Sequence, residues 1–251
     1  MHNNILLLGG SGRLGSNIIK SKLFINIKYP SKKTLNILNK KKIKEFLIKN
    51  NIDLILHCAG IARVKECEKN KKNAFRINVD GTKNIVNSII EIQKKNNKTI
   101  KLVFISSDAV YPSVKGNYKE NDKLKSYNYY GLTKIKGEKL VKKVKKYIII
   151  RTRFFDKKKI PFNYSATNIY NSGLELSVFV KYMHKLIRRK FCGIINVGGP
   201  KISDYKKYKK YKKNLKPCDK SKILNEINLK IATDASLNTS KLKKILWIKF
   251  L

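Results

Sequence analysis

A tyrosine and a lysine four positions apart, Tyr130 and Lys134, are the pair in this sequence best suited to proton transfer. Positions i and i+4 share one face of a helix, so the ammonium can approach the phenol. A nearby cation favours the phenolate and is expected to lower the pKa of the tyrosine, which is about 10 without neighbours. Ser106, Ser107 and Asp108 end an apolar run before this helix, where a hydroxyl could hydrogen-bond a carbonyl. The combination predicts acid–base chemistry at a carbonyl group.

Three glycines near the start of the chain predict a dinucleotide site. Gly9, Gly12 and Gly15 stand between a short apolar run and a segment with helical spacing. Glycine permits a tight turn and lets a pyrophosphate approach the backbone, while the N-terminus of the helix offers free N–H donors. The alternative is a turn that needs glycine for structural reasons only.

The residues that follow the glycines favour NADP(H) over NAD(H). Folds that bind NAD usually carry an acidic residue about twenty positions further on, where it holds the ribose hydroxyls. This chain has no Asp or Glu before Glu45, whereas Arg13, Ser31, Lys32 and Lys33 offer donors and positive charge for a 2′-phosphate. NAD(H) stays open as the alternative, because lysine is abundant throughout the chain.

Short apolar runs alternate with helical segments along most of the chain. The runs are 4–8, 53–57, 101–106, 147–150 and 193–197, and the helical segments are 14–23, 66–95 with a break near Asp80 and Gly81, 127–145 and 175–189. This order predicts an α/β fold, a Rossmann-type doubly wound parallel sheet with ligands at the carboxyl ends of its strands. We expect an NAD(P)-binding domain over residues 1–155 and a small substrate lobe over residues 156–251, partly interwoven with it.

The composition is strongly basic, with 58 Lys and Arg against 16 Asp and Glu and a net charge of +42. Lys, Asn and Ile are the residues of A/T-rich codons, so genome bias explains this charge without selection for polyanion binding. A real attraction to polyanions is the alternative. Tyr205, Tyr208 and Tyr211, each followed by two lysines, predict a packed tyrosine stripe under a solvated lysine surface, with a phosphate or nucleic-acid patch as the alternative.

The remaining composition excludes several other classes of protein. With 42% apolar residues the chain can bury a core, so global disorder is not expected. The four cysteines and three histidines lack the spacing of a zinc site or a disulfide framework, so no metal is expected. No run of about 18 apolar residues is present to form a membrane span. We expect a soluble, cytoplasmic protein without a membrane or a specific nucleic-acid partner.

Five motifs resemble, in order and spacing, those of the extended short-chain dehydrogenase/reductases. They are Gly9-x-x-Gly12-x-x-Gly15, His57-Cys58-Ala59-Gly60, Asn78-Val79-Asp80-Gly81-Thr82, Ser106-Ser107-Asp108-Ala109-Val110-Tyr111 and Tyr130-Gly131-Leu132-Thr133-Lys134. Within that superfamily the chain looks most like the dTDP-4-dehydrorhamnose reductase group, through segments 64–68, 107–111 and 235–242. The resemblance covers nearly all of the first 150 residues and patches beyond them.

Carried over by position, the resemblance implies a catalytic set and two binding sites. Tyr130 would donate or accept the proton, Lys134 would lower its pKa and contact the nicotinamide ribose, and Ser107 would polarise the carbonyl. Asp108 and Phe154 would join Ser107 in binding the sugar, with Phe154 in place of a tryptophan common in the group. The implied cofactor contacts are Gly9, Gly12, Arg13, Leu14, Gly15, Asn36, Ile37, Ala59, Gly60, Ile61, Tyr130 and Lys134.

These implications favour an NAD(P)(H)-dependent oxidoreductase acting on a sugar nucleotide, most like a 4-keto-sugar reductase that makes polysaccharide precursors. Two departures leave the substrate open: segment 171–175 lacks the motif of the group, and segment 155–177 is short for a nucleotide-sugar loop. A sugar-nucleotide epimerase or dehydratase is one alternative, although Asp108-Ala109 matches the dehydratase pair poorly. A non-catalytic dinucleotide-binding regulatory subunit is another. The superfamily suggests a homodimer by analogy, and His57 is expected to be structural.

Overall fold

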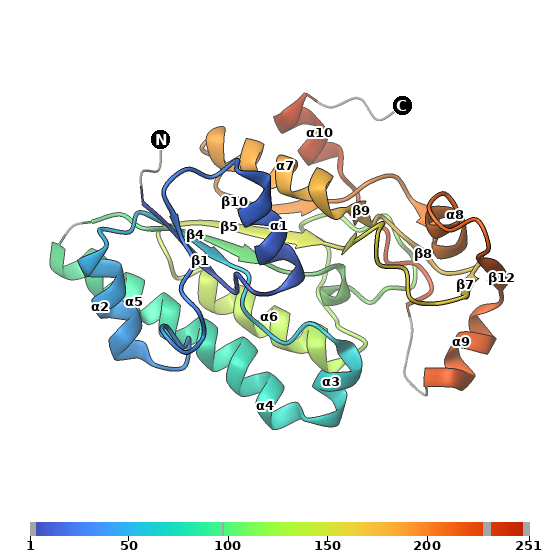
Figure 1. Ribbon diagram of the computed structural model, residues 1–251, viewed down its shortest axis with the longest axis horizontal. Coiled ribbons are helices and arrows are strands. Elements are labelled where there is room, and N and C mark those ends of the chain that lie inside the picture. The colour runs from blue at the N-terminus through green and yellow to red at the C-terminus, as the bar shows by residue number, and fades with distance from the viewer. Residues whose placement is uncertain (1–3, 97, 228–231, 248–251) are drawn as a thin grey trace.

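The computed structural model describes residues 4–96, 98–227 and 232–247. Its centre is a six-stranded sheet with the order β10-β5-β4-β3-β1-β2 and parallel pairing throughout (Figure 1). The strands are β1 (Ile5–Leu8), β2 (Ile27–Lys28), β3 (Leu54–His57), β4 (Lys101–Ile105), β5 (Lys146–Thr152) and β10 (Gly193–Val197). The α/β fold with a doubly wound parallel sheet is therefore confirmed.

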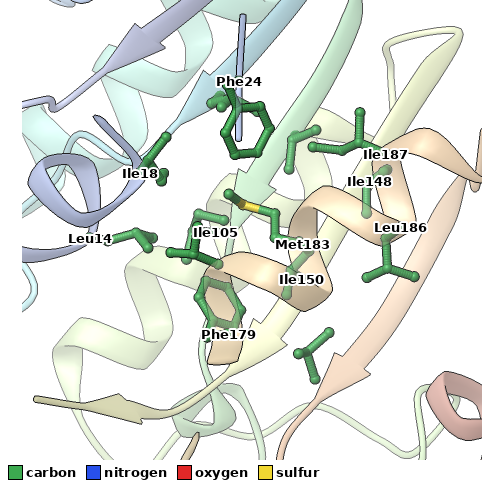
Figure 2. Packing of buried hydrophobic residues seen from close by; sticks show 14 of the residues in the cluster. Leu14, Ile18, Phe24, Ile105, Ile148, Ile150, Phe179, Met183, Leu186 and Ile187 are labelled. Carbon is green, nitrogen blue, oxygen red and sulfur yellow. The ribbon is translucent and has the colours of Figure 1, made fainter. Parts of the chain in front are cut away.

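Helices cover both faces of the sheet, because the central strands β1, β3 and β4 are buried on both sides. One face packs against α1 (Arg13–Ser21), α7 (Leu176–Arg188) and α10 (Ser240–Leu246). The other face packs against α2 (Lys40–Lys49), α5 (Gly81–Asn96) and α6 (Tyr129–Val141). Figure 2 shows the first core, where Phe179 and Met183 of α7 lie over Ile105 of β4 and Ile150 of β5.

The connection from β3 to β4 differs from the predicted helix in where it is interrupted. It consists of α3 (Val64–Lys69), α4 (Lys71–Phe75), the π-helical turn η1 (Arg76–Asp80) and α5. The predicted break near Asp80 and Gly81 is wrong, since Gly81 keeps helical angles of −58° and −43°. The interruption lies at Asn70, whose non-helical backbone begins α4 and whose side chain accepts a hydrogen bond from the Asn73 amide.

Short elements fill the region beyond the end of β5. They are η2 (Asp108–Val110), β6 (Phe154–Phe155), β7 (Tyr164–Ala166), β8 (Tyr170–Asn171), β9 (Leu174–Glu175), β11 (Ile202–Ser203), α8 (Asp204–Lys209), β12 (Lys216–Cys218) and α9 (Lys220–Ile227). The pairs β6–β9, β8–β11 and β7–β12 form three small sheets. The boundary at residue 155 stays a prediction, and α7 and β10, which follow it, lie with the main sheet (Figure 1). Within the described residues, no helix is long and apolar enough to cross a membrane.

Candidate functional site

Ser107 and Tyr130 meet at the carboxyl end of β4. Ser107 follows this strand and caps η2, where its hydroxyl oxygen accepts a hydrogen bond from the Ala109 amide at 3.1 Å. Tyr130 lies in the first turn of α6, which begins after Asn128, whose side chain accepts from the Gly131 amide at 2.8 Å. The Ser107 hydroxyl lies close enough to the Tyr130 phenol to lower the pKa of the phenol. The sequence predicted Ser107 at the end of a strand and Tyr130 in the helix that follows, and the structure brings the two side chains together.

Burial, and not a cation, dominates the acidity of Tyr130. It raises the pKa of the phenol above its usual value, while the Ser107 hydroxyl and the charge of Arg153 act in the opposite direction. The expectation that Lys134 would leave this pKa lowered is therefore wrong for the protein on its own. Spacing along a helix predicts proximity, but removal of the phenol from water penalises its charged form more strongly. Tyr130 is consequently a neutral proton donor near pH 7.

Lys134 lies one turn further along α6 and is almost completely buried, with 8% of its surface exposed. Its ammonium donates to the Ile105 carbonyl at 2.9 Å and lies 5.8 Å from the centroid of the Tyr130 ring. Burial lowers its pKa to about 8, with smaller opposing contributions from Cys58, Cys67 and Glu138. The side chain therefore carries its charge near pH 7 and loses it just above.

A buried ion pair fixes the helix that carries Tyr130 and Lys134. Glu138 of α6 accepts from the Arg151 guanidinium at 2.7 and 3.0 Å and from the Ser106 hydroxyl at 2.6 Å. Arg151 belongs to β5 and also donates to the Tyr111 hydroxyl at 2.8 Å. Because both charges are at most 2% exposed, this pair ties α6 to β4 and β5 with bonds that water does not weaken.

The three glycines in the turn between β1 and α1 stand there for different physical reasons. Gly9 has a φ of +89°, and a Cβ there would lie 2.6 Å from the Ala59 amide nitrogen. A Cβ on Gly15 would lie 2.2 Å from the Gly9 carbonyl oxygen, so helix and turn pack too closely for a side chain.

Gly12 is the glycine that the fold does not require. It has a φ of −74°, which any residue adopts, and its nearest contact for a Cβ is the Gly9 carbonyl oxygen at 3.4 Å. The space left beside Gly12 and the start of α1 fit a pyrophosphate that approaches the backbone. Arg13 is exposed beside this turn, whereas Leu14 packs into the core, so only the backbone of Leu14 could reach a cofactor (Figure 2).

The other predicted cofactor contacts lie after β2 and β3. Ala59, Gly60 and Ile61 form the loop after β3, and the loop is held by Asn78 of η1, which bonds the Ile61 amide at 2.8 Å and its carbonyl at 2.9 Å. The role of Asn78 was not predicted, although the residue stands in one of the quoted motifs.

Asn36 and Ile37 precede α2. Asn36 is half-buried and accepts from the Leu38 amide at 3.0 Å. Ile37 is buried and would meet a Cβ on Gly81 at 2.6 Å, so its side chain packs against α5. Only the backbone of Ile37 remains for a cofactor, and the binding roles of both residues stay predictions.

The residues expected to bind the sugar differ in how accessible they are. Asp108 is 3% exposed, and its two oxygens accept from the Ser107 hydroxyl at 3.1 Å and from the Arg153 Nε at 2.6 Å. Phe154 is half-buried and stacks on Phe179 of α7 with ring centroids 5.4 Å apart. Arg153 was not predicted as a site residue, because nothing in its local pattern indicates a partner 45 positions away.

The Tyr/Lys repeat contributes two side chains to this region. Tyr208 of α8 packs edge-on against Phe155 and Phe162, and burial raises its pKa, which the nearby charges of Arg153 and Arg13 act to lower. Lys207 is buried and donates to Asp204 at 2.7 Å, so the expectation of a uniformly solvated lysine surface is wrong for this residue. The repeat itself gives no signal that tells an inward from an outward lysine.

His57 is buried at the end of β3, and its Nε2 lies 3.0 Å from the Thr82 hydroxyl. Thr82 donates its own proton to the Asn78 carbonyl, so the histidine nitrogen is the donor of this pair. Burial lowers the pKa of His57 to about 3, which leaves the ring neutral. Across the part of the chain that the structure describes, no group of three or more His, Cys, Asp or Glu could hold a metal ion.

Comparisons with known proteins agree with this arrangement. The family model described as RmlD substrate binding domain matches residues 3–180. Among solved structures, the dTDP-4-dehydrorhamnose reductase from Bacillus anthracis in complex with NADP has a TM-score of 0.85 at 22% identity, covering 97% of this chain and 93% of that one. A hypothetical dTDP-4-dehydrorhamnose reductase from Sulfolobus tokodaii has a TM-score of 0.80 at 27% identity, covering 97% and 94%.

The curated relatives differ in their names. The chain is 27% identical over 149 residues to methionine adenosyltransferase 2 subunit beta of Bos taurus, covering 56% of this chain and 43% of that protein. It is 27% identical over 208 residues to dTDP-4-dehydrorhamnose reductase of Aggregatibacter actinomycetemcomitans, covering 79% and 63%. It is 30% identical over 128 residues to UDP-glucose 4-epimerase of Mycoplasma genitalium, covering 48% and 36%. Each match thus spans less than two thirds of the relative's length.

Proposed function

The chain belongs to the RmlD substrate binding domain family, and from this premise we propose that it is an NADP(H)-dependent reductase of a 4-keto sugar nucleotide. The observation that carries the proposal is the meeting of Ser107, Tyr130 and Lys134 next to the loop after β3, against which Gly9 of the glycine turn packs. We extend the proposal to the synthesis of polysaccharide precursors, where such sugars are used.

The chemistry follows from the protonation states of the site. The bound cofactor would supply a hydride to the carbonyl carbon. Tyr130 is a neutral phenol and would give its proton to the carbonyl oxygen as negative charge develops there. The Lys134 ammonium would favour the phenolate that remains, and the Ser107 hydroxyl would turn from Asp108 to hydrogen-bond the same oxygen. The product is the alcohol.

NADP(H) is the cofactor we propose, for two reasons. The turn that follows β2 presents Ser31, Lys32 and Lys33 to solvent, which suits a 2′-phosphate. The reductase from Bacillus anthracis that shares the fold is in complex with NADP. NAD(H) would need an acidic partner for its ribose, and no Asp or Glu stands before Glu45.

Two measurements test the proposal. Calorimetry should give micromolar binding of NADPH, and a Lys32→Glu/Lys33→Glu variant should weaken it while NADH binding stays unchanged. The matched control is Lys142→Glu/Lys143→Glu, which makes the same charge change on exposed residues beyond α6. With a 4-keto sugar nucleotide, NADPH oxidation should fall about 100-fold or more in Tyr130→Phe, because a positioned acid contributes at least that much.

A regulatory subunit is the second candidate, favoured by the similarity to methionine adenosyltransferase 2 subunit beta. A regulatory subunit would give a different result in the same measurements. NADPH would bind, but the wild type and Tyr130→Phe would oxidise it equally slowly with every keto sugar nucleotide. Absence of binding to either dinucleotide, by folded protein freed of cofactor, would contradict both candidates.

A further inference from the structure

The guanidinium of Arg153 is the cation beside the reacting groups that the proposed reduction does not use. Arg153 follows β5 directly, and its Nε donates to one oxygen of Asp108 at 2.6 Å. The other oxygen of Asp108 accepts from the Ser107 hydroxyl at 3.1 Å. Arg153 therefore lies two hydrogen bonds away from the hydroxyl that would polarise the carbonyl.

A ligand at this point meets Arg153 and not Asp108. The Asp108 side chain is 3% exposed and has both oxygens engaged, whereas the Arg153 side chain is 31% exposed. The site consequently presents hydrogen-bond donors where a free carboxylate would have presented acceptors. A sugar hydroxyl suits a carboxylate, but a planar guanidinium is matched best by another oxyanion, which it can bind through two parallel N–H bonds.

Arg153 is held in place before any ligand arrives. Its carbonyl accepts from the Leu174 amide at 2.9 Å, its Nε is bound to Asp108 at 2.6 Å, and its guanidinium lies close enough to the Tyr127 hydroxyl to lower the pKa of that tyrosine. These contacts reduce the side-chain entropy that binding would otherwise cost.

The charges around Arg153 are close to balanced, so a bound anion would not meet an unpaired carboxylate there. The nearest carboxylates are Asp108 and Asp204, and Asp204 is already bound to Lys207 at 2.7 Å and to Asn171 at 2.8 Å. Two carboxylates thus face two buried or half-buried cations. Arg13, close enough to affect the same Tyr208, adds one further positive charge.

We propose that Arg153 determines specificity by binding a carboxylate on the sugar, on the ring atom next to the carbonyl that is reduced. This inference rests on the proposed function, because it places the carbonyl at Ser107. The diphosphate of a sugar nucleotide is attached across the ring from a 4-keto group, so it is too remote to be the anion that a residue beside Ser107 binds. A carboxylate in place of the hydroxymethyl group, by contrast, is carried by the neighbouring ring carbon.

The test uses pairs of stable ligands that differ only in this group. The full-length protein, saturated with NADP⁺ at physiological salt, is titrated with UDP-glucose and UDP-glucuronate and with the two corresponding dTDP sugars. We expect the wild type to bind the glucuronate at least about tenfold more tightly, as a charge-assisted hydrogen bond allows. Arg153→Gln should bring this ratio to about one, with the affinity for the glucose ligand changed less than about threefold.

Two further variants separate recognition from bulk charge and from folding. Arg189→Gln removes one exposed positive charge at the end of α7 and should keep the tenfold preference. Arg153→Lys keeps a cation beside the buried Asp108, so loss of folding is not expected in this variant. It should keep only part of the preference for the glucuronate, because lysine lacks the planar guanidinium.

Three results would overturn the proposal. These are equal affinity of the wild type for the two members of a pair, a preference that survives in Arg153→Gln, and a preference lost equally in Arg189→Gln. Absence of binding to all four sugars would instead reject the sugar-nucleotide function on which the proposal rests.

Discussion

Replacing Lys134 by methionine should make the protein more stable while abolishing its proposed activity. The ammonium is 8% exposed, and burial lowers its pKa from 10.5 to about 8. The shift measures how much more poorly the folded protein holds this charge than the unfolded chain does. Methionine has a similar length and no charge, so it removes the cost of burying the ammonium.

The size of the gain follows from the pKa. A difference of 2.5 between 10.5 and about 8 corresponds to about 3 kcal/mol of unfolding free energy at pH 7, where both states are protonated. The lost hydrogen bond to the Ile105 carbonyl offsets about 1 kcal/mol of this. We therefore expect Lys134→Met to raise the unfolding free energy by about 2 kcal/mol at pH 7.

The cost of burying the Lys134 ammonium depends on pH. The folded pKa is lowered, so between pH 8 and 10.5 the unfolded chain binds more protons and the wild type gains stability as the pH rises. The cost of the buried ammonium should accordingly fall from about 3 kcal/mol at pH 7 to about 1 kcal/mol at pH 9.5.

Urea denaturation of the cofactor-free wild type and of Lys134→Met at both pH values measures this difference. Other lysines and tyrosines titrate in the same range, but they are common to both proteins and cancel. The exposed Lys142→Met serves as control and should show no pH-dependent difference from the wild type. A destabilised Lys134→Met, or a difference that does not shrink by pH 9.5, would refute the reasoning.

Two further predictions concern the glycine turn and the support of α6. Gly12→Ala should keep its urea midpoint, since its new Cβ has only the Gly9 carbonyl oxygen at 3.4 Å, but should weaken NADPH binding about tenfold or more by calorimetry. Gly15→Ala, with a Cβ 2.2 Å from the same oxygen, should instead unfold at lower urea, and the reverse pattern would contradict both assignments. Glu138→Gln should lose about 3–5 kcal/mol of unfolding free energy because Arg151 is left buried without its countercharge. A smaller loss, close to that of the control Glu45→Gln, would mean that the Tyr111 hydroxyl and the Glu120 carbonyl satisfy Arg151 alone.

The fold and the meeting of the proposed catalytic residues follow from patterns that the sequence carries. Apolar runs such as 101–106 can be buried on both faces only in a parallel sheet covered by helices, and this sheet is what forms. Ser107 ends such a run and Tyr130 begins the next helix, so topology alone places both at the carboxyl edge. The glycine turn is equally local, because it depends on three residues within one connection.

Burial and long-range pairing are the features that the sequence did not predict. The spacing of Tyr130 and Lys134 gave proximity, but the direction of the tyrosine pKa depends on how much water the rest of the chain excludes. The pairing of Arg153 with Asp108 joins the ends of two neighbouring strands, and no local pattern distinguishes Arg153 from Arg151, which faces Glu138 instead. The break expected near Asp80 and Gly81 does not form, because Gly81 stays helical; a Cβ there would lie 2.6 Å from the Ile37 Cδ1, so this glycine serves close packing and not a helix end.

Burial also distinguishes lysines that only reflect the composition of the chain from lysines that have a specific role. Genome bias would account for exposed lysines at little cost, but burying an ammonium is expensive unless it is paired, so a buried lysine needs a separate reason. Lys207 has that reason in Asp204, a carboxylate at 2.7 Å. Lys134 is bound to a carbonyl, and within the described residues no carboxylate forms an ion pair with it. Burying the Lys134 ammonium without an ionic partner costs about 3 kcal/mol. Stability alone does not explain such a residue, which supports a role for Lys134 in the chemistry.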